Sequence, residues 1–490
     1  MKVFIITEGG KDIGFGHVTR CLSLYQAFEE KGIKPKFTIN GDNDIECLLN
    51  GANYQLLNWI EKPDKIFKLI KDADIAIIDS YLADISFYNT LSDLVKIPVY
   101  IDDDKRLDYP DGVVLNGNIH AEKLNYPKKD GITYLLGTKY TPLRKEFWEV
   151  PEKKIKEKIE SVMVTFGGDD AKNMTPKILK FLNKEYSNLK KNIIIGRAFQ
   201  NIDEIKKEKK EEDKSTNLIY YPNAQKIKET MLKSDIAISA GGQTLYELAR
   251  IGVPTVGICI AENQLGSIRE WEKIGFLGNA GWYNEDNIIA RVDRLLKHLK
   301  NIKLRETKSK IGKKFVDGKG SIRIIKILLF NFFKNVLILR KVIFEDALNI
   351  FNLSNDDLVR KNSFNPEKIK WKNHLIWLKK KLEDENSIYF AIVDALDKFY
   401  GQVRFDINTK KEEAIINISL GEKIRGLGLS YFVIDKSINE LLKIKSIKLI
   451  KAYIKYDNIP SIKSFEKANF IFLDNQIIKG NKSKVYIKEV

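Results

Sequence analysis

Cysteine and histidine are scarce in this chain, and their spacing argues against two kinds of site. The 490 residues include three cysteines and four histidines. The cysteines, Cys21, Cys47 and Cys259, lie far apart and form no Cys-x-x-Cys pair, so we expect a reducing cytoplasm and no disulfide framework. No His-x-x-x-His motif and no His/Cys cluster is present, so we expect no bound metal.

Long apolar runs are also absent, which argues against membrane segments. The best candidate, 322–333, is interrupted by Arg323, Lys326 and Asn331, whereas a membrane crossing needs roughly 18 apolar residues. The first apolar run, 3–7, is too short for a signal peptide and predicts a strand. We therefore expect a cytoplasmic protein without a transmembrane helix.

Acidic residues are fewer than basic ones. The chain has 83 Lys and Arg and 66 Asp and Glu, which gives a net charge of +17. Such a charge can indicate nucleic-acid binding. The lysines, however, are scattered among acidic residues, as in the run 206–214, which is typical of solvated helix faces. We expect no nucleic-acid partner, and a basic binding or regulatory module remains the alternative from another class.

A glycine pair between a strand and a helix predicts an anion site. Gly241 and Gly242 let the backbone turn sharply and approach a ligand, and Gln243 and Thr244 then open a helix. The helix start directs N–H groups and partial positive charge toward a diphosphate. Glu247 is expected to accept hydrogen bonds from a ribose diol. The alternative is an ordinary strand–turn–helix corner.

His17 follows a second glycine loop, 9–16, at the start of another helix. The order of strand, glycine loop, helix and strand predicts a doubly wound parallel sheet. The loop lacks both a Walker A ending and an intact Gly-x-Gly-x-x-Gly, so we expect no dinucleotide. A helix N-terminus favours neutral imidazole, so His17 is predicted to be a general base, and a capping or packing histidine is the alternative.

Polar residues follow three predicted strands in series, which indicates the rim of a cleft. Asp79 and Tyr81 come after the first, 102–104 after the second and 116–118 after the third. We expect Asp79 and Tyr81 to orient His17 or to contact a sugar. For the carboxylates of 102–104, loop capping is the alternative.

The chain then repeats this plan and afterwards changes it. After a lysine-rich linker, 151–158, strands and a Gly167-Gly168 turn predict a second Rossmann-like lobe, with a ligand cleft between the lobes. Beyond residue 336, three strands at hairpin spacing precede the basic glycine turn 421–430 and a helix, which again predicts an anion cradle. The length fits about three domains, predicted at 1–148, 149–335 and 336–490.

Residues 1–330 resemble the UDP-sugar hydrolases of pseudaminic acid biosynthesis, which are similar in fold to the two-domain GT-B glycosyltransferases. The matching motifs are Gly14-x-Gly16-His17-x-x-Arg20, Asp79-Ser80-Tyr81, Leu136-Gly137-x-x-Tyr140-x-x-Leu143-Arg144-x-x-Phe147, Phe166-Gly167-Gly168-Asp169, Ser239-x-Gly241-Gly242-Gln243-Thr244-x-x-Glu247 and Asn263-Gln264. The resemblance implies cleavage of UDP-2,4-diacetamido-2,4,6-trideoxy-β-L-altropyranose to UDP and free sugar. It implies that His17 activates water, and that Asn263 and Gln264 contact the hexose. Substrate contacts are also expected from the remaining motif residues Gly14, Gly16, Arg20 and Gly168.

A GT-B glycosyltransferase is the alternative, since it would bind the same donor. It needs an apolar or membrane-facing acceptor groove, and loop 9–16 shows no apolar docking face. Water is therefore the expected acceptor, and the helix start at 241–244 would stabilise charge on the β-phosphate without a metal.

Residues 336–490 resemble the GNAT family of N-acetyltransferases, whose acetyl-CoA motif Gln/Arg-x-x-Gly-x-Gly/Ala is matched by Lys423-x-x-Gly426-x-Gly428, with lysine at its first position. The resemblance implies that N–H groups of 424–430 hold the pyrophosphate and that strand 415–420 pairs with the pantetheine amides. The expected acetyl-CoA contacts are Leu420, Lys423, Arg425, Gly426, Gly428, Leu429, Ser430 and Asn458.

Phe465 stands where the GNAT family has a tyrosine that protonates the departing thiolate. Tyr453 or Tyr456 would replace that acid, or no residue would, and a non-catalytic α/β module is the alternative for this part. The two resemblances together imply an α/β chain with two Rossmann-like lobes in a GT-B arrangement and a C-terminal GNAT α+β domain. They imply a bifunctional enzyme that acetylates the 4-amino group of UDP-4-amino-4,6-dideoxy-N-acetyl-β-L-altrosamine and then removes UDP. Such a fusion raises effective concentration.

Overall fold

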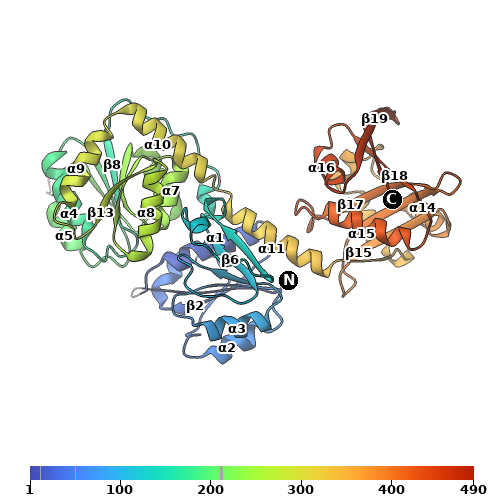
Figure 1. Ribbon diagram of the computed structural model, residues 1–490, viewed down its shortest axis with the longest axis horizontal. Coiled ribbons are helices and arrows are strands. Elements are labelled where there is room, and N and C mark those ends of the chain that lie inside the picture. The colour runs from blue at the N-terminus through green and yellow to red at the C-terminus, as the bar shows by residue number, and fades with distance from the viewer. Residues whose placement is uncertain (11–12, 50, 210–212) are drawn as a thin grey trace. The chain divides into compact units, whose positions relative to one another are not determined.

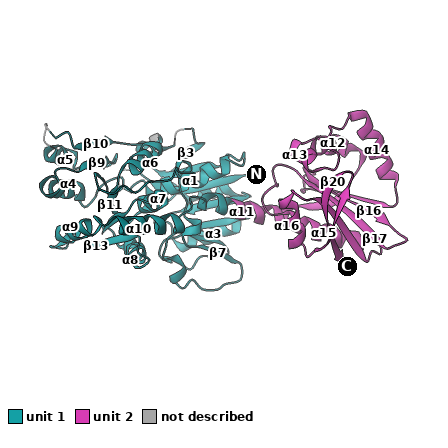
Figure 2. Ribbon diagram, turned by 90° about the horizontal axis from the view of Figure 1, so that it is seen from above, with its two compact units in different colours: residues 1–325 teal, residues 326–490 magenta. Residues whose placement is uncertain are grey.

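The computed structural model describes residues 1–10, 13–49, 51–209 and 213–490, and the chain divides into two compact units, 1–325 and 326–490 (Figure 2). Lys11 and Asp12 of the first glycine loop, and 210–212 of the charged run, lie outside the described residues.

The first sheet of unit 1 is parallel, with strand order β3-β2-β1-β4-β5-β6-β7. Figure 1 labels two of its strands, β2 and β6. The order reverses between β1 and β4, and ligands bind at the carboxyl ends of strands at such a switch point. Its elements are β1 (Val3–Gly9), α1 (Gly16–Glu29), β2 (Lys36–Gly41), η1 (Asn43–Leu48), β3 (Tyr54–Leu56), α2 (Pro63–Ile70), β4 (Ile75–Asp79), α3 (Ile85–Leu94), β5 (Pro98–Ile101), β6 (Gly112–Asn116), η2 (Ala121–Lys123), β7 (Ile132–Leu136), η3 (Thr138–Tyr140) and η4 (Lys145–Phe147). β1 and β4 are buried along their whole length, which explains their continuous apolar runs.

The second sheet of unit 1 is also parallel, with order β10-β9-β8-β11-β12-β13 and its own reversal between β8 and β11. Its elements are β8 (Ser161–Thr165), α4 (Met174–Glu185), β9 (Lys190–Ile195), α5 (Ile202–Glu208), β10 (Thr216–Tyr220), α6 (Ala224–Lys233), β11 (Ile236–Ala240), α7 (Gln243–Ile251), β12 (Thr255–Cys259), η5 (Glu262–Gln264), α8 (Leu265–Lys273), β13 (Leu277–Trp282), α9 (Ile288–His298) and α10 (Ile302–Phe315). Helix α7 ends at Gly252, whose φ of +80° suits glycine. The two predicted Rossmann-like sheets are therefore present.

The predicted linker 151–158 is anchored and not merely solvated. It has no regular structure, but Lys153 is buried and its Nζ donates to the carbonyl oxygens of Met231 and Leu232 near the end of α6. Burial lowers the pKa of Lys153 to about 8. A lysine at this place supplies donors to carbonyl groups that the helix leaves open.

Unit 2 contains the third sheet, in the order β14-β15-β16-β17-β18-β20-β19, antiparallel except for the β17–β18 pair. Its elements, after helix α11 (Gly320–Val336), are β14 (Ile338–Lys341), η6 (Phe344–Asp346), α12 (Ala347–Ser354), α13 (Asp357–Asn362), α14 (Trp371–Glu383), β15 (Ser387–Val393), β16 (Phe399–Asn408), β17 (Glu413–Leu420), α15 (Ser430–Leu442), β18 (Leu449–Lys455), α16 (Ile459–Lys467), β19 (Ile471–Ile478) and β20 (Asn481–Glu489). The two final strands have eight and nine residues, and Lys479 and Gly480, both at positive φ, close the tight hairpin between them.

Glycine is required where two loops of the second sheet meet. A Cβ on Gly196, after β9, would lie 2.2 Å from the carbonyl oxygen of Gly168, after β8. The clash would be with backbone, which cannot rotate away as a flexible side chain can. The position of the Gly168 loop therefore depends on Gly196.

We expect Gly196→Ala to lower the free energy of unfolding by about 1–3 kcal/mol, because the added methyl group overpacks the loop junction. Gly16→Ala is the matched control, since no atom lies within 4 Å of its added Cβ. Urea denaturation of both variants measures the difference, and equal midpoints would contradict the assigned close approach.

Candidate active site

His17 and Asp79 meet at the switch point of the first sheet. His17 is the second residue of α1, and Asp79 is the last residue of β4. The imidazole Nδ1 lies 2.7 Å from the Asp79 Oδ1, and the side chain of Asp79 is fully buried. Because an ionised carboxylate only accepts hydrogen bonds, we assign the proton to Nδ1, which leaves a lone pair on Nε2.

Arg20 lies between two carboxylates, Asp79 and Asp103. Its Nη2 donates to Asp79 at 2.6 Å, and its Nη1 donates to both oxygens of Asp103 at 2.8 and 2.9 Å. Burial raises the pKa of Asp79, but the charge of Arg20 and the hydrogen bonds from Arg20 and His17 outweigh burial and hold that pKa well below its usual value. The contact of Arg20 with substrate stays a prediction. Its observed ion pairs hold Asp79 in place beside His17, and these two residues form the His17–Asp79 dyad.

Tyr81 extends this cluster toward solvent. Its ring meets the His17 ring edge-on, with centroids 4.6 Å apart, and its hydroxyl donates to Asp103. Asn263, from the second sheet, donates to the Tyr81 hydroxyl at 3.3 Å. Buried Glu8 accepts from the Tyr81 N–H at 2.7 Å and so holds the loop in place.

Glu8 and Asp103 were not singled out from the sequence. Both lie at carboxyl ends of strands, the position at which polar residues were predicted to gather. Of the three carboxylates in 102–104, only Asp103 joins the cluster. Asp102 accepts from the Arg106 N–H in its own loop, as the loop-capping alternative holds, and Asp104 lies 3.1 Å from His120.

Two of the three glycine turns of unit 1, the loop 9–16 and the turn at Gly167-Gly168, lie against each other. Gly14 has a φ of +88°, and Gly16 is the first residue of α1. A Cβ on Gly168 would lie 3.1 Å from the ring of Phe15. The second loop therefore packs against the first at the base of the dyad.

The helix start after β11 is open toward solvent at one glycine only. Gly242 is the N-cap of α7 and has no side chain to cap the helix, so the first N–H groups can receive an anion. Gly241 serves packing instead, because a Cβ there would lie 2.7 Å from Ile268. The Gln243 side chain donates to the Pro142 carbonyl at 2.6 Å. Among the described residues, the Thr244 side chain has no hydrogen-bond partner.

Gln264 has a different observed contact from the one predicted. Its Oε1 accepts from the N–H groups of Gly241 and Ile260, at 3.1 and 3.3 Å. It therefore supports the glycine turn from behind, because a side-chain carbonyl satisfies backbone donors that the turn leaves unpaired. Its contact with the hexose stays a prediction.

Glu247 is buried in the second turn of α7 and forms a two-oxygen ion pair with Arg144. The guanidinium Nε and Nη2 lie 2.9 and 2.7 Å from Oε1, and Nη2 lies 2.9 Å from Oε2. Burial raises the pKa of Glu247, and Arg144 partly offsets that rise. The predicted ribose contact is untested, and the observed role of this carboxylate is to join α7 to the segment after the first sheet.

Tyr246 connects the two sheets beside the cluster. Its hydroxyl accepts from the Ile119 N–H at 3.1 Å and donates to Asn118 Oδ1 at 3.0 Å. Asn118 in turn donates to Asp103 at 2.8 Å. The strand-end residues 116–118 therefore link the dyad to α7, a role that no local pattern around Tyr246 indicates.

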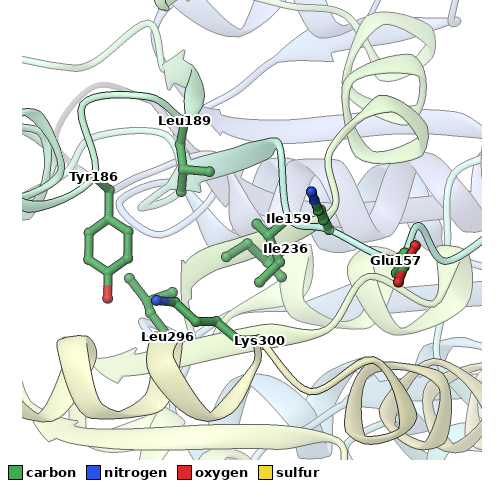
Figure 3. Close-up of a pocket in the computed structure, with 8 residues that line it drawn as sticks. Glu157, Ile159, Tyr186, Leu189, Ile236, Leu296 and Lys300 are labelled. Carbon is green, nitrogen blue, oxygen red and sulfur yellow. The ribbon is translucent and has the colours of Figure 1, made fainter.

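A cavity of about 340 Å³ lies away from these residues (Figure 3). Ile159, just before β8, and Ile236, at the start of β11, lie side by side in its wall, with Leu189 and Leu296. These are the amino ends of the strands, opposite to the ends that carry the candidate site. Within the described ranges, no group of three or more His, Cys, Asp or Glu is placed to hold a metal ion. Among those same residues, no helix has the length and apolar character for a membrane crossing.

Unit 2 presents a second candidate site around the turn 421–430. Gly426 and Gly428 have φ of +76° and +89°, and no atom lies within 4 Å of where their Cβ would be. Leu429 is the N-cap of α15, and Ser430 is its first residue. The N–H groups of this turn therefore have space for a pyrophosphate, as the anion-cradle hypothesis requires.

Strand β17 separates from β18 beside this turn. The two strands pair only over Glu413–Ile415, so 416–420 lacks a ladder on that side. An unpaired strand edge can add an extended ligand through main-chain hydrogen bonds, which pantetheine amides provide. The carbonyl of Leu420 accepts from Arg425 at 3.0 Å, and Arg425 also pairs with Asp356, so both predicted contacts already have protein partners.

The other residues predicted to contact acetyl-CoA lie in different surroundings, one exposed and one at a helix cap, and Phe465 is buried. Lys423 lies in the exposed turn, where Lys398 lowers its pKa. Asn458 caps α16 by accepting from the Ser461 N–H at 3.3 Å. Phe465 is buried against Phe470, with ring centroids 5.0 Å apart.

The two alternative acids of unit 2 are not buried. Tyr453 is half-buried in β18, and Tyr456 is exposed. The identity of the acid therefore stays a prediction.

The depressed pKa of Asp79 predicts acid sensitivity of unit 1. Its ionised form stabilises the fold at neutral pH, and this contribution is lost as pH falls below the unfolded value of about 3.9 toward the folded pKa. Asp79→Asn should lower the free energy of unfolding at pH 7 by about 3–5 kcal/mol, since it leaves a buried cation with one partner fewer.

The measurement is urea denaturation of both proteins from pH 7 downward, in which the variant should show the smaller acid loss. Asp108→Asn is the control, because Asp108 forms only an exposed pair with Lys129. It should change stability by at most about 1 kcal/mol. A variant at Asp79 as stable as the parent would contradict the assigned ion-pair cluster.

Comparisons with known proteins match two regions of the chain to known domain families. Residues 161–318 match the glycosyltransferase family 28 C-terminal domain, and residues 336–471 match the acetyltransferase (GNAT) domain. An uncharacterized protein of Methanocaldococcus jannaschii is 26% identical over 96% of both chains. The spermidine N-acetyltransferase of Vibrio cholerae, solved with CoA and spermine, is 20% identical, with a TM-score of 0.30 over 32% of this chain and 96% of that one.

Two relatives carry names that refer to UDP-sugar hydrolysis. The pseudaminic acid cytidylyltransferase and UDP-2,4-diacetamido-2,4,6-trideoxy-beta-L-altropyranose hydrolase of Helicobacter pylori is 26% identical over 56% of this chain and 47% of its own. The UDP-2,4-diacetamido-2,4,6-trideoxy-beta-L-altropyranose hydrolase of Campylobacter jejuni is 23% identical over 56% of this chain and 98% of its own. The chain thus contains a region that matches the glycosyltransferase family 28 C-terminal domain, within a GT-B-type pair of parallel sheets, and a region that matches the GNAT acetyltransferase domain.

Proposed function

We propose that this chain is a bifunctional nucleotide-sugar enzyme. Unit 1 hydrolyses UDP-2,4-diacetamido-2,4,6-trideoxy-β-L-altropyranose to UDP and free sugar. Unit 2 uses acetyl-CoA to acetylate the 4-amino group of the UDP-amino sugar that precedes this substrate. The observation that carries the proposal is the His17–Asp79 dyad at the switch point of a parallel sheet, together with the named hydrolases that the chain resembles.

In the hydrolytic step, His17 Nε2 accepts a proton from water as the water oxygen attacks C1 of the sugar. The bond between C1 and the β-phosphate oxygen breaks, and UDP leaves with the electron pair. Asp79 is fully buried and ionised beside Nδ1, so it stabilises the imidazolium that forms. N–H groups at the start of α7 stabilise the charge on the departing phosphate.

Recognition of the sugar involves the residues next to His17. Tyr81 is partly exposed and lies edge-on to the imidazole, and Asn263 reaches its hydroxyl from the second sheet. A sugar beside His17 would therefore contact side chains from both sheets of unit 1. Such two-sided contact positions the anomeric carbon, which is the main requirement when the leaving group is already good.

In the acetyl-transfer step, the 4-amino group attacks the thioester carbonyl of acetyl-CoA, the carbon–sulfur bond breaks and CoA leaves as a thiolate. The open turn at Gly426 and Gly428 would hold the pyrophosphate, and the free edge of 416–420 would hold the pantetheine. Phe465 has no proton to donate, so the thiolate takes its proton from Tyr453, Tyr456 or solvent.

A glycosyltransferase is the second candidate, because the family 28 match favours it. The same donor site would then pass the sugar to an acceptor hydroxyl instead of water. Mass spectrometry of products from the purified chain, the UDP-4-amino sugar and acetyl-CoA separates the two. Free diacetylated sugar in water alone supports hydrolysis, and a strict acceptor requirement would support transfer.

His17→Ala should reduce UDP release by at least about 100-fold, the usual contribution of a general base, while acetyl transfer stays unchanged. His298→Ala is the matched control, since His298 is an exposed residue of α9. Phosphate-coupled detection of UDP and a thiol assay for CoA measure the two activities separately. Normal hydrolysis by the His17 variant would rule out this base.

Gly428→Val should have the opposite effect, abolishing acetyl transfer and preserving hydrolysis of the diacetylated substrate. Its φ of +89° strains any residue with a Cβ, and the side chain would enter the open turn. Gly480→Val is the control, because Gly480 has a similar φ of +78° in the β19–β20 hairpin turn. Acetyl transfer that survives the Gly428 change would mean that the turn does not bind acetyl-CoA.

A further inference from the structure

Strand β19 is an edge of the sheet in unit 2 and exposes apolar side chains along most of its length. In the sheet order it neighbours β20 alone (Figure 1). The exposed fractions are 71% for Ile471, 45% for Phe472, 53% for Leu473 and 74% for Ile477. An edge of this kind offers unpaired main-chain groups and an apolar surface together, a combination that soluble proteins usually avoid.

The other edge of the same sheet shows how such exposure is avoided. Strand β14 has four residues, and two of them, Arg340 and Lys341, are basic. Short edge strands with cations resist further pairing. Strand β19 has eight residues, no proline and one charged residue, Asp474. The difference within one sheet indicates that β19 is built to be paired.

We propose that β19 is an interface with a second copy of this chain, in which the two β19 strands pair antiparallel about a two-fold axis through Asn475. The sheets of the two GNAT domains then become continuous. A two-fold pairing buries the same edge on both copies and leaves no further open edge at that place, so the assembly closes as a dimer.

The side chains select this register. In an antiparallel pair of identical edges, opposed residues share the same hydrogen-bonding state, so the axis passes through one residue position. An axis at Asn475 puts Asp474 opposite Gln476 of the second copy. It also puts the apolar 472–473 opposite 477–478. The Asp474 carboxylate then faces the Gln476 amide, which can donate to it, and apolar side chains face apolar side chains.

Neighbouring registers are less favourable. An axis at Asp474, or a parallel in-register pairing, places two Asp474 carboxylates directly opposite each other, which is destabilising. An axis at Gln476 places Asp474 opposite Ile478 and Leu473 opposite Lys479. The β19–β20 ladder is irregular between Phe472 and Asp474, so the regular stretch that contains the axis is 474–478. The apolar side chains of 472–473 lie beyond that stretch, and they would meet 477–478 of the second copy through side-chain packing.

Cysteine cross-linking of the full chain tests the axis. In Asn475→Cys, the two thiols face each other across the axis with Cα atoms about 4.5–5.5 Å apart, within the range of a disulfide. In the matched variant Gln476→Cys, the two thiols are offset by two residues, about 7 Å along the strand, and cannot bond. After mild oxidation, only Asn475→Cys should give a covalent dimer, with the parent chain showing the background of its own cysteines.

Sedimentation and light scattering test the interface without cysteine. The parent should have twice the 56.5 kDa of one chain. Ile477→Lys should weaken dimerisation at least tenfold, since it puts an edge lysine where an isoleucine packed. Leu396→Lys is the control, because Leu396 is 91% exposed in a turn away from β19, and it should leave the mass unchanged. Circular dichroism and acetyl transfer confirm that each variant folds.

Two results would overturn the proposal. One is a parent chain that stays monomeric up to about 100 μM, which would mean that any dimer is too weak to cover the edge. The other is a dimer that Ile477→Lys does not weaken and Asn475→Cys does not cross-link, which would assign the interface to another surface.

Discussion

The buried guanidinium of Arg20 is the interaction on which the candidate site of unit 1 depends. It lies between Asp79 and Asp103, at the ends of two neighbouring strands of the first sheet, and its charge lowers the pKa of both carboxyl groups against the opposing effect of burial. A buried charge is tolerated only when it is paired and hydrogen-bonded. The ion pair with Asp79 therefore fixes α1 against β4, and this contact orients His17, the proposed general base.

Several residues expected to touch ligands also hold the backbone of the candidate sites in place. Gln264 supports the turn at Gly241, Glu247 anchors α7 through Arg144, and Arg425 accompanies Leu420 at the end of β17. A binding loop loses less entropy on binding when it is already ordered, so such supporting contacts contribute to affinity without touching the ligand.

Sequence reasoning predicted the three sheets, most strand positions and the residues of the dyad, because glycine turns and apolar runs act locally. It did not predict Glu8, Tyr246 or the part played by Asp103. It also described the linker 151–158 without the buried Lys153. In each case the sequence does not show which residue the side chain contacts. Tyr246, for example, donates a hydrogen bond to Asn118, which lies 128 positions away in the chain. No periodicity encodes a contact at that separation.

The sequence by itself determined the α/β plan, the two glycine turns of unit 1 and the acetyl-CoA-type turn of unit 2, because these depend on backbone freedom and side-chain polarity within about ten residues. Only the tertiary structure decided which polar groups meet. His17 lies 62 positions from Asp79, Arg20 lies 83 positions from Asp103 and Arg144 lies 103 positions from Glu247. The first two pairs form because the start of α1 packs beside the carboxyl ends of β4 and β5, and the third forms because α7 packs on the segment that follows the first sheet. In each place burial makes a charge require an opposite one.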